Sequence, residues 1–135
     1  MSIKKISISN FRCFDSVDLE FSELNNFIHG ANGSGKTSVL EALYFCSTGR
    51  SFKSSNKNLC IQNKKEAFKI QLDTFDNNKI RILKEVKKSI LLEINESKAT
   101  SIELFRAIPS TLLDNKTFSM LQIHQNTEEK YSTDA

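Results

Sequence analysis

Apolar and polar residues alternate along the first part of the chain. The alternation is nearly regular from Ile3 to Asn10, and it is clean through Val17, Leu19 and Phe21. A period of two predicts strands with one buried face, so we expect two strands joined by a turn at NFRCFD (10–15). The short apolar segment NNFIH (25–29) runs into glycine and predicts a buried strand before a loop.

A helical period follows. Val39, Leu40, Leu43 and Tyr44 recur at helical spacing, which predicts a helix from Thr37 to about Cys46. The next segment, 47–58, is polar and has no period, so we expect a loop there.

The middle of the chain returns to a period of two. Segments 67–75, 80–86 and 89–95 predict strands of an antiparallel sheet, with turn residues at 76–79 between the first two. Thr100 precedes Glu103 by three residues, the spacing of a capping box, and predicts a short helix. Pro109 then separates this helix from an extended piece, STLLD (110–114). Beyond Met120 the sequence is polar and aperiodic, which predicts a frayed tail.

Three of the chain's four glycines lie within GANGSGKT, between the predicted strand and the predicted helix. The segment satisfies G-x-x-x-x-G-K-[ST], with Gly30, Gly35, Lys36 and Thr37 at the fixed positions. A loop that turns its N–H groups onto phosphates needs backbone angles that glycine permits, and the helix that follows adds the positive end of its dipole. Lys36 would bind the β- and γ-phosphates and Thr37 would ligate Mg²⁺.

We therefore expect a nucleotide site here. Its residues are Gly30, Ala31, Asn32, Gly33, Ser34, Gly35, Lys36, Thr37 and Ser38.

Nucleotide hydrolysis would need a further acidic residue at the end of an apolar strand. Glu93 and Asp114 are the best candidates. Glu93 lies within an alternating strand, where a solvated face is the simpler interpretation, and Asp114 is more typical of a turn. We therefore assign no catalytic residue.

Composition adds few constraints. The chain has 135 residues, enough for one domain, and a net charge of +3, which neither requires nor excludes nucleic acid. No apolar run approaches the length of a membrane helix, so no membrane partner is expected. Cys13, Cys46 and Cys60 are odd in number and form no CxxC, which indicates idle thiols in a reducing cytoplasm rather than a disulfide or metal framework.

Three segments of the chain carry a family resemblance and match in order and spacing: NFR, GANGSGKTSVLEAL and GRSFKS. In these segments the chain resembles the N-terminus of the RecF family, whose members are ABC-type ATPases related to SMC proteins. The resemblance is strong from Ile3 to about Lys53 and collinear, though weaker, up to FSML (118–121). It implies an α/β fold with a mixed sheet. That fold would be the N-terminal lobe of an ABC/SMC-like P-loop ATPase head with an antiparallel β part.

The resemblance also implies function. Members of the family bind ATP, dimerise around it, engage DNA at single-strand to double-strand junctions and help partner proteins to load the recombinase. Residues 30–37 would bind ATP and Mg²⁺, and Arg12 in the NFR turn would lie near the nucleotide. Arg50 and Lys53, on either side of Phe52, are candidates for DNA contact, but a solvated loop that packs Phe52 is equally compatible. Lys84, Lys87 and Lys88 are more typical of a hydrated strand edge.

The chain also departs from the family. Complete members are far longer, and neither the LSxGQ signature nor an hhhhDE run occurs here. We therefore expect residues 1–121 to form a partial ATPase domain and 122–135 an unstructured or aberrant tail, with no appreciable ATPase activity. Two alternatives remain open. A small P-loop kinase or GTPase is disfavoured by the antiparallel middle and the lack of NKxD; a truncated, non-functional fragment is the other.

Overall fold

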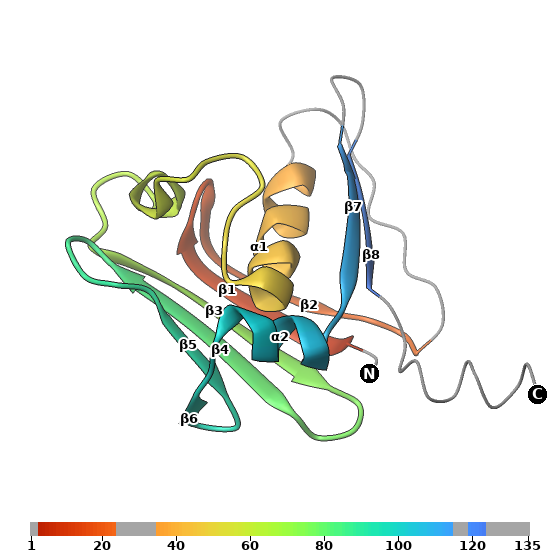
Figure 1. Cartoon of the computed structure of the whole chain (residues 1–135). Coiled ribbons are helices and arrows are strands. Elements are labelled where there is room, and N and C mark those ends of the chain that lie inside the picture. Colours follow the sequence, from red (N-terminus) through yellow and green to blue (C-terminus); the bar gives the residue numbers. More distant parts are fainter. Residues whose placement is uncertain (1–2, 24–34, 115–118, 124–135) are drawn as a thin grey trace, which may run out of the picture.

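A sheet of six antiparallel strands packs against helix α1 (Lys36–Thr48) in the computed structural model, which describes residues 3–23, 35–114 and 119–123 (Figure 1). Among these residues the strand order is β2-β1-β3-β4-β5-β6, and every pairing is antiparallel. The strands are β1 (Ile3–Phe11), β2 (Phe14–Glu20), β3 (Ala67–Thr74), β4 (Lys79–Glu85), β5 (Leu91–Ile94) and β6 (Ser97–Lys98).

Helix α1 lies between this sheet and a second, two-stranded sheet (Figure 1). The second sheet pairs β7 (Ser110–Asp114) with β8 (Ser119–Ile123). Helix α2 (Ser101–Ala107) packs beside α1 and leads into β7. This placement explains why α1 is buried on nearly all sides: Ser47, on its last turn, donates a hydrogen bond to the Ile108 carbonyl at 2.5 Å and pairs with the Ser110 hydroxyl at 2.7 Å.

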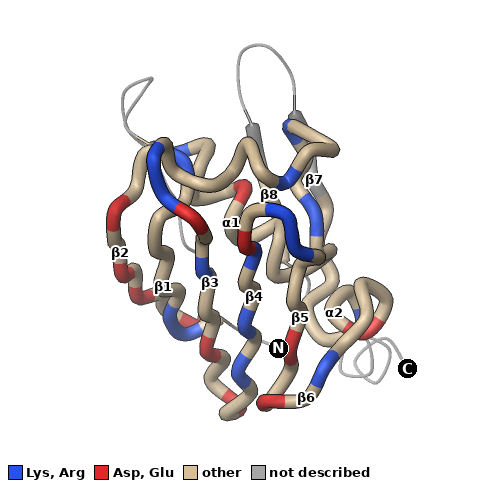
Figure 2. Tube along the Cα trace, turned by 90° about the vertical axis from the view of Figure 1, so that its left-hand side faces the viewer, with Lys and Arg blue, Asp and Glu red and all other residues tan. Residues whose placement is uncertain are grey.

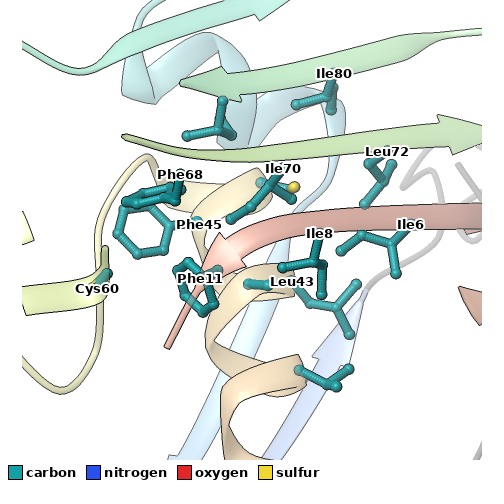
Figure 3. Packing of buried hydrophobic residues seen from close by; sticks show 14 of the residues in the cluster. Ile6, Ile8, Phe11, Leu43, Phe45, Cys60, Phe68, Ile70, Leu72 and Ile80 are labelled. Atoms are coloured by element: carbon teal, nitrogen blue, oxygen red, sulfur yellow. The ribbon is translucent and has the colours of Figure 1, made fainter. Parts of the chain in front are cut away.

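The core forms because alternate residues of β1, β3 and β4 face α1. Cross-strand register aligns Ile8 with Ile70 and Ile70 with Ile82, and all three side chains are fully buried. Three phenylalanines close one end of the core (Figure 3). The Phe11 ring packs edge-on against Phe45 and Phe68 at centroid distances of 5.9 and 5.0 Å. The core therefore fixes α1 against the end of β1, next to the turn that leads into β2.

Most predicted elements are confirmed. The first two strands, the helix after the glycines, the antiparallel middle and the strand at 110–114 are all present. The capping box also forms, since the Thr100 hydroxyl accepts from the Glu103 N–H at 3.1 Å and the Glu103 carboxylate accepts from the Thr100 N–H at 3.4 Å. The strand predicted at 25–29 lies outside the described residues.

Three expectations need correction. The polar segment 47–58 is not all loop: α1 extends to Thr48, and a 3₁₀ helix, η1, spans Lys57–Cys60. The tail predicted from residue 122 overlaps β8, which continues to Ile123 because Gln122 and Ile123 pair with Thr111 and Ser110 of β7. We therefore place the end of the lobe no earlier than Ile123.

The third correction concerns Lys84. It lies on β4, inside the sheet, on the face that carries Ile80 and Ile82, and its side chain is buried. Its ammonium group donates to the carbonyls of Glu85 and Lys88 in the following turn. Lys84 therefore stabilises the turn after β4 and does not form part of a hydrated strand edge. Its long aliphatic stem lies in the core while its charged end reaches carbonyl oxygens.

Candidate nucleotide site

The candidate phosphate-binding end of α1 begins at a left-handed glycine. Gly35 is the N-cap, with φ 92° and ψ 2°, and its carbonyl accepts the Val39 N–H at 3.0 Å. No side chain caps this end, and the first turn, which contains Lys36, Thr37 and Ser38, has no acidic residue. The first N–H groups of a helix have no partner within the helix and carry partial positive charge. This end of α1 is therefore suited to an anion.

Gly35 also packs closely against the turn between β1 and β2. A Cβ atom at Gly35 would lie 2.7 Å from Cζ of Phe14 and 3.4 Å from Sγ of Cys13. Glycine is therefore required here twice, once by the positive φ and once by the approach of the Phe14 ring. The preceding candidate residues, Gly30, Ala31, Asn32, Gly33 and Ser34, lie outside the described residues, and their role stays a prediction.

Arg12 lies in the same turn, at φ 52°, and reaches α1. Its Nε and Nη2 atoms donate to the two carboxylate oxygens of Glu41, each at 2.8 Å, and Nη1 donates to the Leu59 carbonyl at 3.3 Å. These bonds raise the pKa of the Arg12 guanidinium, chiefly through the hydrogen bond to Glu41. A guanidinium has five N–H groups, so at most two others are available to a ligand.

Glu41 is fully buried and is the functional candidate that the sequence did not reveal. Besides Arg12 it accepts hydrogen bonds from the Ser51 hydroxyl and from the Cys60 thiol, the latter with a sulfur–oxygen distance of 3.7 Å. Burial, and next the Glu41 charge, raise the pKa of Cys60 to about 11. The available signal was one carboxylate among apolar residues in SVLEALYF, which marks a buried charge that needs a partner.

Glu41 lies five positions after Lys36, about 7.5 Å along the helix axis. The Arg12 guanidinium therefore lies beside the second turn of α1, close to the end that carries Lys36. Its predicted role near the nucleotide is compatible with this placement and stays a prediction.

The candidate DNA-binding segment is held on α1. Thr48 Oγ1 accepts from the Arg50 N–H at 3.3 Å, and the Phe52 ring packs edge-on against Tyr44 with centroids 5.5 Å apart. The Arg50 and Lys53 side chains are exposed. Phe52 therefore packs against the protein, as the alternative interpretation expected, while the two cations face solvent.

The outer face of the six-stranded sheet offers no uniform charge. Figure 2 shows acidic residues along β2 and basic residues along β4. On the other side of β4 the signs mix: Arg81 on β4 forms an ion pair of 3.1 Å with Glu93 on the neighbouring strand β5. Glu93 is thus part of a surface pair, as its alternating strand suggested, and not a metal ligand near α1.

Asp114 falls in β7 rather than in the turn for which its sequence is typical. Within residues 3–23, 35–114 and 119–123, no three His, Cys, Asp or Glu side chains cluster to hold a metal ion. The same residues include no helix long and apolar enough to cross a membrane.

Comparison with known proteins identifies the family. Residues 5–134 match the family described as an AAA domain. The chain belongs to this family. The resemblance to RecF is also confirmed: the DNA replication and repair protein RecF of Francisella tularensis subsp. novicida (strain U112) is 34% identical over 124 residues, which cover 90% of this chain and 36% of that protein.

Solved structures agree. A structure of the recombination mediator protein RecF with ATP, from the RecFOR pathway, superimposes with a TM-score of 0.69 at 31% identity, over 77% of this chain and 30% of that one. A structure from work on ATP-driven dimerisation of SMC ATPases superimposes with a TM-score of 0.67 over 78% of this chain and 76% of that one. Its identity is 22%, so it supports the fold alone.

These matches establish the expected fold class, the N-terminal lobe of an ABC/SMC-like P-loop ATPase head with an antiparallel β part. The chain spans about 36% of the length of the curated RecF relatives that it matches.

Proposed function

We propose that this chain binds ATP with Mg²⁺ through residues 30–38, as the ATP-binding part of a RecF-type protein of DNA replication and recombinational repair. One observation carries the proposal: α1 begins at Lys36 directly after a left-handed Gly35 inside GANGSGKT, and no acidic side chain lies in its first turn. The RecF structure solved with ATP, at 31% identity, supports the same assignment.

Each group then has a defined role. The first-turn N–H groups and Lys36 bind the phosphates, and the Thr37 hydroxyl ligates Mg²⁺. Arg12 adds positive charge beside the second turn of α1, where its bond to Glu41 fixes its direction. The bound Mg²⁺ would neutralise phosphate charge. Because the chain lacks LSxGQ and hhhhDE sequences, we propose binding without appreciable hydrolysis by this chain alone.

The wider role follows the family. We propose that the RecF-type protein binds single-stranded and gapped or junction DNA, with Arg50 and Lys53 as candidate contacts, and that it works with recombination mediator proteins to support recombinase loading. We also propose an ATP-dependent homodimer and a cytoplasmic location. The exposed cations on a segment fixed to α1 support the DNA contact.

Thermal unfolding with and without ligand tests ATP binding. A ligand that binds only the folded state stabilises it by about 2.7 kcal/mol at a concentration of 100 Kd. We expect Mg-ATP to raise the Tm of the chain and Mg-AMP to raise it far less, because the proposed contacts are to the β- and γ-phosphates. A folded chain with no Tm shift in saturating Mg-ATP would contradict the proposal and favour a fragment without function.

A further inference from the structure

Three segments that are distant in sequence meet at the buried carboxylate of Glu41. Arg12 comes from the turn between β1 and β2, Ser51 from the segment after α1, and Cys60 from η1. Arg12 also bridges to η1, through its side chain to the Leu59 carbonyl and through its backbone N–H to the Cys60 carbonyl at 2.8 Å. One carboxylate on α1 thus holds both the turn and the segments that follow the helix.

Ser51 is the link to the basic segment, defined here as residues 50–54. Its hydroxyl oxygen accepts the N–H groups of Lys53 and Ser54 at 2.9 and 3.2 Å, and its proton is donated to Oε2 of Glu41. The same Oε2 atom accepts from Nη2 of Arg12 at 2.8 Å. A single oxygen therefore joins the guanidinium beside the candidate nucleotide site to the turn that presents Arg50 and Lys53.

We propose that Glu41 is a positioning residue that couples nucleotide binding to the basic segment, whose partner is a phosphate-rich polymer such as a nucleic acid strand. The inference rests on the proposed ATP site. A phosphate that engages Arg12 competes with Glu41 for the guanidinium. The remaining negative charge on Oε2 then acts on Ser51, and the position of the basic segment changes. Hydrogen bonds to a charged, buried acceptor are stronger than those to an exposed one, because water does not compete for the acceptor. A change at Arg12 therefore alters the hydrogen bond between Glu41 and Ser51.

The rate of trypsin cleavage after Arg50 and Lys53 measures how firmly the basic segment is held, because trypsin cuts after these two residues. We expect Ser51→Ala, which removes the link but keeps the Arg12–Glu41 pair, to raise the rate of cleavage there at least fivefold. Glu41→Gln should do the same. Cleavage after the exposed Lys98, on β6, measures any general loss of stability and serves as the internal reference. Ser55→Ala, at an exposed serine next to the segment, and Glu93→Gln are the matched controls and should leave the ratio unchanged.

Mg-ATP supplies the second comparison. In the unmodified chain, saturating Mg-ATP should change the ratio of cleavage at Arg50 and Lys53 to cleavage at Lys98 at least threefold. In Ser51→Ala the ratio should not respond, although the Tm still rises with Mg-ATP. Nucleotide-dependent affinity for a gapped DNA duplex, followed by fluorescence anisotropy, should fall at least fivefold in the same variant.

The outcomes separate the two proposals. Absence of any Tm shift in the unmodified chain contradicts the ATP site. Wild-type cleavage ratios in both Ser51→Ala and Glu41→Gln without nucleotide contradict the positioning role, whatever the result for ATP. A Tm shift with an unchanged nucleotide response in Ser51→Ala contradicts the coupling alone.

Discussion

Arg12 and Glu41, which are 29 positions apart, form a two-pronged ion pair with both nitrogen–oxygen distances at 2.8 Å. The carboxylate is fully buried, whereas the Arg12 side chain is 24% exposed. A charge removed from water is stable only when its hydrogen bonds are satisfied, and here the donors come from the guanidinium, a hydroxyl and a thiol. The pair therefore joins the start of the sheet to the helix that carries Lys36.

Loss of this pair should lower stability. We expect Glu41→Ala to reduce the free energy of unfolding by about 3–5 kcal/mol, because it leaves Arg12 without its partner and opens a cavity in α1. Glu93→Ala breaks the ion pair with the exposed Arg81 and should cost no more than about 1 kcal/mol. Urea unfolding followed by circular dichroism measures both. Equal, small losses of unfolding free energy in the two variants would show that the buried pair contributes no more to stability than the surface pair.

The closeness of Gly35 to Phe14 gives a second prediction. Gly35→Ala should destabilise the chain by about 1–3 kcal/mol, because φ 92° disfavours a side chain and the new Cβ would meet the Phe14 ring at 2.7 Å. Phe14→Ala removes the clash but not the strain in φ. The double variant should therefore lose less stability than the two single variants together. Additive losses would mean that Phe14 does not crowd Gly35.

The three thiols should react differently. Cys13 is exposed, while Cys46 and Cys60 are buried. Iodoacetamide should thus modify Cys13 alone in the folded chain and all three in urea, as mass spectrometry would record. Since the Cys13 sulfur lies beside Gly35, Mg-ATP should slow its alkylation severalfold. Protection by Mg-AMP to the same extent would argue against a site that recognises the β- and γ-phosphates.

Alkaline pH should weaken the fold through Cys60. Its pKa is about 11 in the folded chain and about 8.5 when unfolded, so between these values the folded state binds the additional proton. The contribution to stability is complete below about pH 8.5 and is lost as the pH rises through 11, at no more than about 1.4 kcal/mol per pH unit.

Cys60→Ser keeps a donor to Glu41 and does not ionise in this range. The unfolding free energy of this variant should fall less steeply from pH 8.5 to 10.5 than that of the unmodified chain, by urea unfolding at each pH. Parallel slopes would contradict the assignment.

Local signals in the sequence predicted local structure well. The Thr100–Glu103 capping box needs only residues within one turn, and the alternation in β1, β3 and β4 needs only one buried face. Contacts between residues that are far apart in the sequence could not be predicted from such local signals. The Arg12–Glu41 pair depends on how the turn packs on α1, and β8 exists because β7 supplies its hydrogen bonds. The face of Lys84 follows from the same alternation, since Lys84 comes two residues after Ile82 in β4, whereas the cluster of lysines alone indicates an exposed edge.

The same distinction between local and long-range features applies to the candidate site. The phosphate-loop pattern predicted a helix directly after the glycines, and α1 begins at Lys36, one residue before the predicted start at Thr37. That Gly35 is the residue with a positive φ is known from the structure alone. The pattern did not predict that Glu41 would restrain Arg12, nor that Tyr44 would be the residue against which Phe52 packs. Those relations are set by the tertiary packing around α1.

The affinity of Lys36→Ala for Mg-ATP, measured by isothermal titration calorimetry, tests the central claim most directly. Lys79→Ala, at an exposed lysine on β4, is the matched control for charge. We predict that Lys36→Ala weakens binding at least tenfold, with a melting temperature close to that of the unmodified chain, while Lys79→Ala binds as before. Unchanged affinity in Lys36→Ala would contradict a phosphate site at the start of α1.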